Sequence, residues 1–274
     1  MLEPRAVVLL DFSGTLSLGA VLFARPASLV EALQRSHLWE LGVDSLQVFW
    51  EEIVNPTWEE GSTTGKGYRR LLCERVRELA RRRGIEVDED ELKRRAAAFV
   101  AAYLARSAID PAWGTVLRAL ASRPSVAAIV ATDHYAEATA HIVGELTALG
   151  LAAAPALSAQ GPGVVLVANS ADLGAPKASR GFWERLWEAL GAPPIARAVI
   201  VDDLGANEQP QDSYAAPEMI QRRMAQMVQS VAAVFRTQVA AFPFVLGQEA
   251  DMDRYHQLIR NAADFICHLV DESA

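Results

Sequence analysis

The sequence predicts an α/β fold in which helices cover both faces of a Rossmann-like parallel sheet. Three short apolar runs, at residues 6–12, 126–132 and 198–203, carry hydroxyl or carboxylate side chains at their carboxyl ends. Continuous apolar runs of this length, bounded by turn residues, are typical of strands buried on both faces of a sheet. Helical periodicity follows each run, and strands that alternate with helices indicate parallel pairing.

Further elements complete this main domain. Residues 163–168 read GVVLVA and predict another strand, and residues 180–190 predict a helix that Gly191 and Pro193 close. The tail from about residue 215 is mostly helical in pattern, with helices expected at 217–235 and 251–270. Between them the run VAAFPFVL is either a last strand or an apolar connector.

A helical insertion is expected after the first strand. Residues 17–107 read as helical pattern almost throughout, with no convincing buried strand and with candidate helices at 27–40, 44–54, 67–83 and 88–106. Pro111 and Gly114 mark the return of the chain to the sheet. We therefore expect an α/β core formed by residues 1–16 and 110–274, and a helical cap domain formed by residues 17–109.

The composition limits the classes of function. The 274 residues are 51% apolar and carry a net charge of -8, which disfavours a nucleic-acid partner. The basic run at 75–83 alternates with apolar residues, as on the solvated face of a helix. Cys73 and Cys267 are too few for a disulfide framework, and no segment resembles a signal peptide or an apolar span of roughly 20 residues. We expect a cytoplasmic protein with no membrane partner.

Four polar elements follow the predicted strands and loops in order. They are residues 11–15, which read DFSGT, then Thr132, Lys177 and the pair Asp202-Asp203. Ligands of parallel α/β sheets bind at the carboxyl ends of the strands, so these side chains are expected to meet there. The order and its surroundings resemble the four motifs of the haloacid dehalogenase-like (HAD-like) superfamily over roughly residues 6–210, most specifically in the first and fourth motifs.

The resemblance implies that Asp11 is a covalent nucleophile beside a bound Mg²⁺ ion. A carboxylate attacks a phosphoryl group only where the charge of both partners is screened, and hard cations prefer oxygen ligands. The expected metal ligands are the carboxylates of Asp11 and Asp202 and the backbone carbonyl of Ser13. Asp203 is expected either to bind the ion through water or to hold the loop.

The resemblance also implies the groups that bind the substrate. Thr132 and its neighbour Asp133 are expected beside the phosphoryl oxygens, and the Lys177 ammonium is expected to neutralise charge on both Asp11 and the transferred group. Lys177 precedes an aromatic-rich helix, as the third motif usually does. The implied activity is Mg²⁺-dependent hydrolysis of a small phosphorylated or phosphonylated metabolite through an aspartyl-phosphate.

Ser13 departs from the phosphatase pattern. Phosphatases of the superfamily carry a second Asp at this position, which protonates the leaving group and later activates water, and a serine hydroxyl is a poor acid or base. Related phosphonatases carry a small residue there, and the metal-independent haloacid dehalogenases carry an aromatic one. A catalytically impaired relative that binds a phosphorylated ligand or a partner protein is a further alternative.

Three residues outside the four motifs are additional candidates. A phosphonatase needs a cap lysine that forms a Schiff base, and the insertion offers Lys66, in a Gly-rich loop, and Lys93. The flexible connector between helices is the alternative interpretation of that loop. His134 is a candidate replacement acid or base, because its ordinary pKa is near neutrality, or else a cap of the next helix.

Apolar side chains suggest a pocket and a dimer surface. Trp39, Trp50 and Trp58 lie in the insertion, where they line a substrate pocket or pack in its core. A homodimer through the C-terminal helices is expected from an apolar stripe formed by Met219, Met224, Met227, Val228, Val231 and Phe235.

Overall fold

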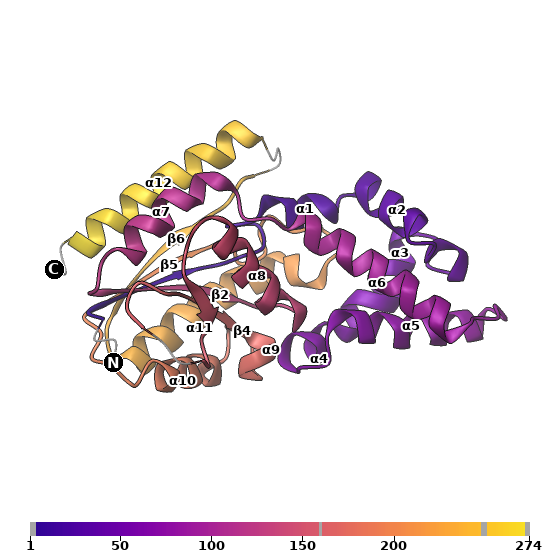
Figure 1. Cartoon of the computed structure of the whole chain (residues 1–274), viewed down its shortest axis with the longest axis horizontal. Coiled ribbons are helices and arrows are strands. Elements are labelled where there is room, and N and C mark those ends of the chain that lie inside the picture. Colours follow the sequence, from indigo (N-terminus) through magenta and orange to yellow (C-terminus); the bar gives the residue numbers. More distant parts are fainter. Residues whose placement is uncertain (1–3, 159–160, 248–250, 272–274) are drawn as a thin grey trace.

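A six-stranded parallel sheet forms the centre of the computed structural model, which describes residues 4–158, 161–247 and 251–271 (Figure 1). The strand order is β3-β4-β2-β1-β5-β6, and each adjacent pair is parallel. This finding confirms the predicted α/β class. The strands are β1 (Ala6–Leu10), β2 (Val126–Thr132), β3 (Ala153–Pro155), β4 (Val165–Asn169), β5 (Arg197–Asp202) and β6 (Gln238–Pro243).

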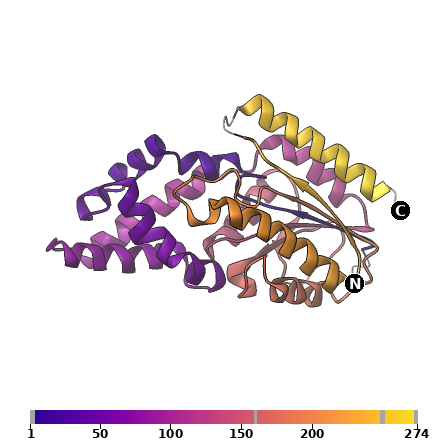
Figure 2. The same ribbon diagram turned by 180° about the vertical axis from the view of Figure 1, so that it is seen from behind.

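Helices cover both faces of the sheet. Successive side chains of a strand point to opposite faces, so Ala6, Val8 and Leu10 of β1 join one buried cluster while Val7 and Leu9 join the other. The first cluster lies under α7 (Pro111–Ala121), α8 (Glu137–Ala148) and α12 (Met252–Asp271). The second lies under α9 (Ser170–Leu173), α10 (Arg180–Ala189) and α11 (Pro217–Phe235), on the opposite side in both views (Figures 1 and 2).

The C-terminal segment is an integral part of this core. The run at residues 239–246 enters β6, which pairs with β5, so the strand alternative is correct. The helices expected at 217–235 and 251–270 are α11 and α12. Strand β3 was not predicted, because it has only three residues and these are alanine and proline, which are depleted in strands.

The described residues 18–106 form no strand and are named here the helical segment. Its helices surround a buried cluster separate from the two that flank the sheet, and it extends away from the sheet in Figure 1. The elements are α1 (Leu18–Phe23), α2 (Pro26–Arg35), η1 (Trp39–Leu41), α3 (Leu46–Val48), the π-helical η2 (Phe49–Val54), η3 (Asn55–Thr57), α4 (Trp58–Thr63), α5 (Tyr68–Arg82) and α6 (Glu89–Arg106).

Several helix predictions in this segment need correction. The helix expected at 27–40 ends at Arg35, and His37 adopts a positive φ of 58° before the chain turns into η1. The helix expected at 44–54 is a short α3 that widens into η2. The wholly apolar α1 and the Gly-containing α4 were missed, because neither has a polar and an apolar face that reveals a helical period.

The cap domain stays a prediction. A separate buried cluster agrees with it, while residues 1–3 and 272–274 of the expected core lie outside the described residues. The basic run at 75–83 lies on α5, whose apolar side chains are buried and whose Arg81 and Arg82 form ion pairs at the surface. No described helix combines the length and apolar character that crossing a membrane requires.

The apolar stripe of α11 packs inside the chain. Met227, Val231 and Phe235 are buried in the cluster between α11, α10 and the sheet, and Met224 and Val228 pack against it. Five of the six residues of the stripe are therefore explained by the core, whereas Met219 is exposed, and the homodimer stays a prediction without the support of the other five.

Candidate active site

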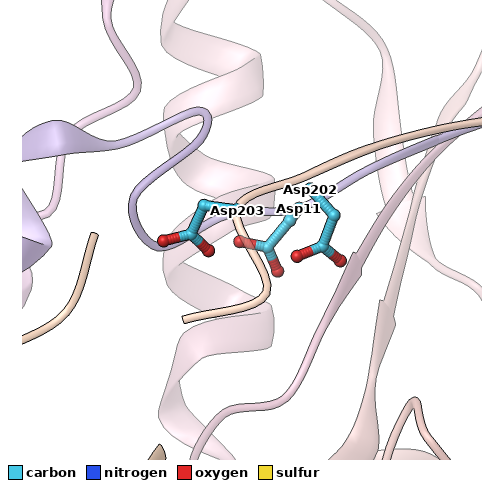
Figure 3. Close-up of side chains that lie close together, drawn as sticks. All are labelled: Asp11, Asp202 and Asp203. Carbon is cyan, nitrogen blue, oxygen red and sulfur yellow. The ribbon is translucent and has the colours of Figure 1, made fainter. Parts of the chain in front are cut away.

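The predicted site residues meet at the carboxyl ends of three adjacent strands. Strand β1 lies between β2 and β5, so Asp11, which follows β1, is flanked by Thr132 at the end of β2 and Asp202 at the end of β5. The backbone N–H of Asp11 donates to the Val201 carbonyl at 2.9 Å. Figure 3 shows Asp11, Asp202 and Asp203 side by side, with one carboxylate oxygen of each within 4.8 Å of the others.

The Lys177 ammonium lies between two of these carboxylates. Its Nζ donates to Asp11 Oδ1 at 2.5 Å and to Asp202 Oδ2 at 2.7 Å, and all three side chains are buried. The backbone of Lys177 is fixed as well, because its N–H donates to Asp133 Oδ1 and its carbonyl accepts the Trp183 indole N–H. Burial lowers the pKa of Lys177, but the Asp11 and Asp202 carboxylates raise it by more. The ammonium therefore stays charged.

The cluster places three carboxyl groups beside one ammonium. Burial raises the pKa of Asp11 well above its ordinary value, the Lys177 ammonium lowers it, and Asp202 and Asp203 raise it further. Burial, with Glu208 and Asp202, raises the pKa of Asp203 to about 8. Buried carboxylates without enough positive charge are costly, and a divalent cation with oxygen ligands would relieve this cost. The chemistry of these donors thus fits Mg²⁺.

Asp203 holds the loop that follows β5. Its two oxygens accept the backbone N–H groups of Gly205 and Asn207, each at 3.0 Å. Two roles were expected for Asp203: binding of the ion through water, or fixing of the loop. The hydrogen bonds of Asp203 support the second role directly. The close approach to Gly14 requires glycine, because φ is +76° there and a Cβ would lie 2.5 Å from Asp203 Oδ2.

Two aromatic residues anchor the loop that carries the nucleophile. The Trp113 indole N–H of α7 donates to the Thr15 carbonyl at 3.0 Å. The Tyr255 hydroxyl of α12 donates to the same carbonyl at 2.7 Å and to the Leu16 carbonyl at 3.0 Å. Both aromatic side chains are fully buried. The role of α12 was not expected, because nothing local to Tyr255 identifies a partner 240 positions away.

Ser13 is paired with an acid that the sequence reasoning missed. Its hydroxyl donates to Glu208 Oε1 at 2.6 Å, and Glu208 is partly buried on the loop after β5. Burial raises the pKa of Glu208 to about 8, with a further contribution from Asp212. The only available signal was an acid within six residues of the fourth motif, and acids are too common in loops for that to be informative.

A cavity of about 100 Å³ lies over these residues, between the sheet and the helical segment. Asp11, Ser13, Thr132 and Asp133 contribute to its floor, and aromatic side chains contribute most of its wall. Of the two alternatives for the tryptophans, Trp58 lines the cavity, Trp50 both lines it and belongs to the buried cluster of the helical segment, and Trp39 packs against that cluster. Gly61 lets α4 approach this wall, because a Cβ there would lie 2.2 Å from the Tyr135 ring.

Neither candidate cap lysine is placed at the cavity. Lys66 is not among the lining residues, and its ammonium pairs with Glu60 at 2.8 Å and Glu74 at 3.0 Å. The hydrogen bonds to these two carboxylates raise the pKa of Lys66, which opposes the neutral amine that Schiff-base chemistry needs. Lys93 is largely exposed and pairs with Asp90. The expectation that Lys66 binds the substrate is not supported.

Asp133 and His134 have structural partners. The Asp133 oxygens accept the Lys177 N–H at 2.8 Å and the Tyr214 hydroxyl at 3.1 Å, so this carboxylate positions Lys177. Burial lowers the pKa of His134 to about 4, so the ring is neutral. Its Nδ1 accepts the Tyr135 N–H, which leaves the proton on Nε2, beside the Tyr103 hydroxyl at 2.8 Å. His134 is thus a weak base, and it does not cap α8.

Comparison with known proteins adds no assignment. No protein-family model matches the chain, and a search of curated proteins gives no match. The site is therefore defined by its own geometry: a parallel α/β sheet with a buried acidic cluster at the carboxyl ends of its central strands.

Proposed function

We propose that the chain is a Mg²⁺-dependent hydrolase of small phosphate esters, of the HAD-like type, that forms an aspartyl-phosphate on Asp11. The observation that carries this proposal is the Lys177 ammonium, which contacts both Asp11 and Asp202 where two adjacent strands end. A buried carboxylate held by a cation at the mouth of a cavity is well placed for attack on an electrophile. Bound Mg²⁺, held by Asp11, Asp202 and the Ser13 carbonyl, would screen the phosphoryl charge.

The remaining residues account for the other parts of the reaction. The bond from Asp11 to phosphorus forms as the bond to the leaving oxygen breaks, and Thr132 and Lys177 bind the phosphoryl oxygens. The leaving oxygen takes a proton from the Ser13 hydroxyl, which takes one in turn from Glu208, its partner at 2.6 Å. Water then attacks the aspartyl-phosphate, and a proton of that water passes to the Ser13 hydroxyl while the hydroxyl passes one to Glu208. Glu208 with Ser13 thus replaces the second Asp of the phosphatase motif.

The two alternative reactions have less support. A phosphonatase of the Schiff-base type needs a neutral lysine at the substrate, and no lysine lines the cavity among the described residues. A haloacid dehalogenase binds a substrate that carries a carboxylate. Among the described residues, the same lining offers no arginine or lysine to pair with that carboxylate.

The test is steady-state hydrolysis of a panel of small phosphate esters with Mg²⁺. Turnover is expected to disappear in Asp11→Asn and in EDTA, to return with added Mg²⁺, and to persist in Asp90→Asn, which removes an exposed acid of the helical segment. A phosphoryl group should be found by mass spectrometry on the peptide that contains Asp11. Full activity in Asp11→Asn refutes the proposal. A wild-type protein that phosphate esters stabilise but that does not hydrolyse them would favour the alternative of a catalytically impaired relative.

A further inference from the structure

Tyr103, near the end of α6, brings a hydroxyl group of the helical segment to the cavity. The residue lines the cavity together with Asp11 and Glu208. Burial raises the pKa of Tyr103, and among charged groups the Glu208 carboxylate raises it most. The hydroxyl therefore stays protonated at neutral pH and lies toward the pair that Glu208 forms with Ser13.

The direction of the Tyr103 hydroxyl proton is restricted by His134. The Tyr135 backbone N–H donates to His134 Nδ1 at 2.8 Å, so that nitrogen carries no proton. The ring is neutral, because burial lowers the pKa of His134 to about 4, and its one N–H group is therefore at Nε2. This N–H donates to the Tyr103 oxygen, which lies 2.8 Å from Nε2. The Tyr103 hydroxyl thus directs its own proton elsewhere.

No described residue accepts that proton in a hydrogen bond of normal geometry. Within the described part of the chain, the contact with His134 is the one hydrogen bond of the Tyr103 hydroxyl. The neighbouring Ser107 hydroxyl donates to the Tyr103 backbone carbonyl at 2.8 Å. Buried polar groups are hydrogen-bonded in the great majority of cases. An acceptor that enters the cavity is therefore expected to complete the bonding of this hydroxyl.

The cavity has about the size of one phosphoryl group. A cavity of roughly 150 Å³ binds benzene, so one of about 100 Å³ is filled by roughly four heavy atoms, as in a PO₃ group. With phosphorus beside Asp11, oxygen atoms of this group reach the wall of the cavity. The lining offers them no lysine or arginine among the described residues. A hydroxyl donor on the wall is then the complement of such an oxygen.

We infer that the Tyr103 hydroxyl donates a hydrogen bond to an oxygen of the phosphoryl group that Asp11 attacks. This inference rests on the proposed function, which places that group at Asp11. The helical segment thus binds the reacting group itself in addition to covering it. A hydrogen bond to a charged oxygen is stronger than one between neutral groups, so a neutral hydroxyl gives a substantial contact without a cation.

Calorimetric titration with inorganic phosphate in the presence of Mg²⁺ tests this contact without any turnover. Tyr103→Phe removes the donor and should weaken phosphate binding by about 20-fold, a typical loss for a hydrogen bond to a charged group. Mg²⁺ alone binds at the acids that follow the strands, so its affinity should be equal in Tyr103→Phe and wild type. Tyr135→Phe is the matched control, because its hydroxyl is buried without a hydrogen-bond partner among the described residues, and it should leave phosphate binding unchanged.

Replacement of Tyr103 by 3-fluorotyrosine decides the question if Tyr103→Phe does not fold. It keeps the ring and makes the hydroxyl a stronger donor, so phosphate should bind more tightly, and an unchanged or weaker affinity overturns the inference.

The outcomes separate this inference from the proposed function. Equal phosphate affinity of wild type and Tyr103→Phe overturns the inference even if phosphate esters are hydrolysed. A parallel loss of Mg²⁺ and phosphate binding also overturns it, because Tyr103 would then only support the fold of the site. A loss of phosphate binding alone upholds it even if no ester is hydrolysed, in which case the proposed hydrolase function alone fails.

Discussion

Replacement of Lys177 by Met tests the electrostatic argument most directly. The substitution keeps the length of the side chain but leaves Asp11 and Asp202 buried without the ammonium that lies 2.5 and 2.7 Å from them. Loss of one partner of a buried ion pair typically costs about 3–5 kcal/mol. We expect Lys177→Met to lower the free energy of unfolding at pH 8 by about that amount when EDTA removes divalent cations. Urea denaturation followed by tryptophan fluorescence measures it.

The pH dependence of this loss has a defined sign. Without the ammonium the pKa of Asp11 rises further above its unfolded value, since burial and the neighbouring acids already raise it. A carboxyl group whose pKa is raised by folding destabilises the folded state increasingly as pH rises above the unfolded pKa. The difference between Lys177→Met and the wild type should therefore shrink from pH 8 to pH 5.

Magnesium ions should restore part of the stability that Lys177→Met loses, because a bound cation replaces the missing positive charge. Lys93→Met is the matched control: the same substitution at a lysine that is largely exposed should change stability little. A loss below about 1 kcal/mol at pH 8, equal to that of a surface pair, would refute the reasoning.

Three further outcomes are expected. Glu208→Gln should lower kcat for alkyl phosphates by about 100-fold, and for p-nitrophenyl phosphate by much less, because that leaving group departs without a proton; equal losses would argue against proton transfer. Tyr255→Phe should lower the free energy of unfolding by about 1–3 kcal/mol, because it leaves the buried Thr15 carbonyl with one donor fewer; an unchanged urea midpoint would contradict this. The pKa of His134, about 4 when folded and 6.5 unfolded, predicts that this residue contributes a loss of about 3 kcal/mol of stability as pH falls from 6.5 to 4; His134→Gln should therefore lose less stability than wild type over this range.

The sequence alone predicted the elements that depend on local patterns. The strand at 126–132 has the predicted bounds, and β1 and β5 agree to within two residues, because a fully buried strand must be apolar along its whole length. The same reasoning brought Asp11, Thr132 and Asp202 together, since parallel strands end at one edge of the sheet. The role of Lys177 was predicted from the order of the motifs, and the structure places its ammonium against the carboxylates of Asp11 and Asp202.

Contacts between distant segments were decided only by the tertiary structure. Ser13 and Glu208 are 195 positions apart, and no local period connects them. The Trp58 ring of the helical segment contacts Tyr135, which follows β2, and Tyr214 of the 3₁₀ helix η4 (Ser213–Ala215). Lys66 was predicted at the substrate because it lies in a Gly-rich loop, but two acids on neighbouring helices pair with it away from the cavity.

The sequence by itself thus determined which chemical groups lie at the ends of the strands. A strand that is buried on both faces is apolar at each position, so the sequence shows where the strand ends and which polar residue follows it. Tertiary packing decided which acid faces Ser13, which helix anchors the loop that follows Asp11, and what lines the cavity. These choices depend on how helices pack onto the sheet and onto one another, and packing is set by the joint shape of many side chains.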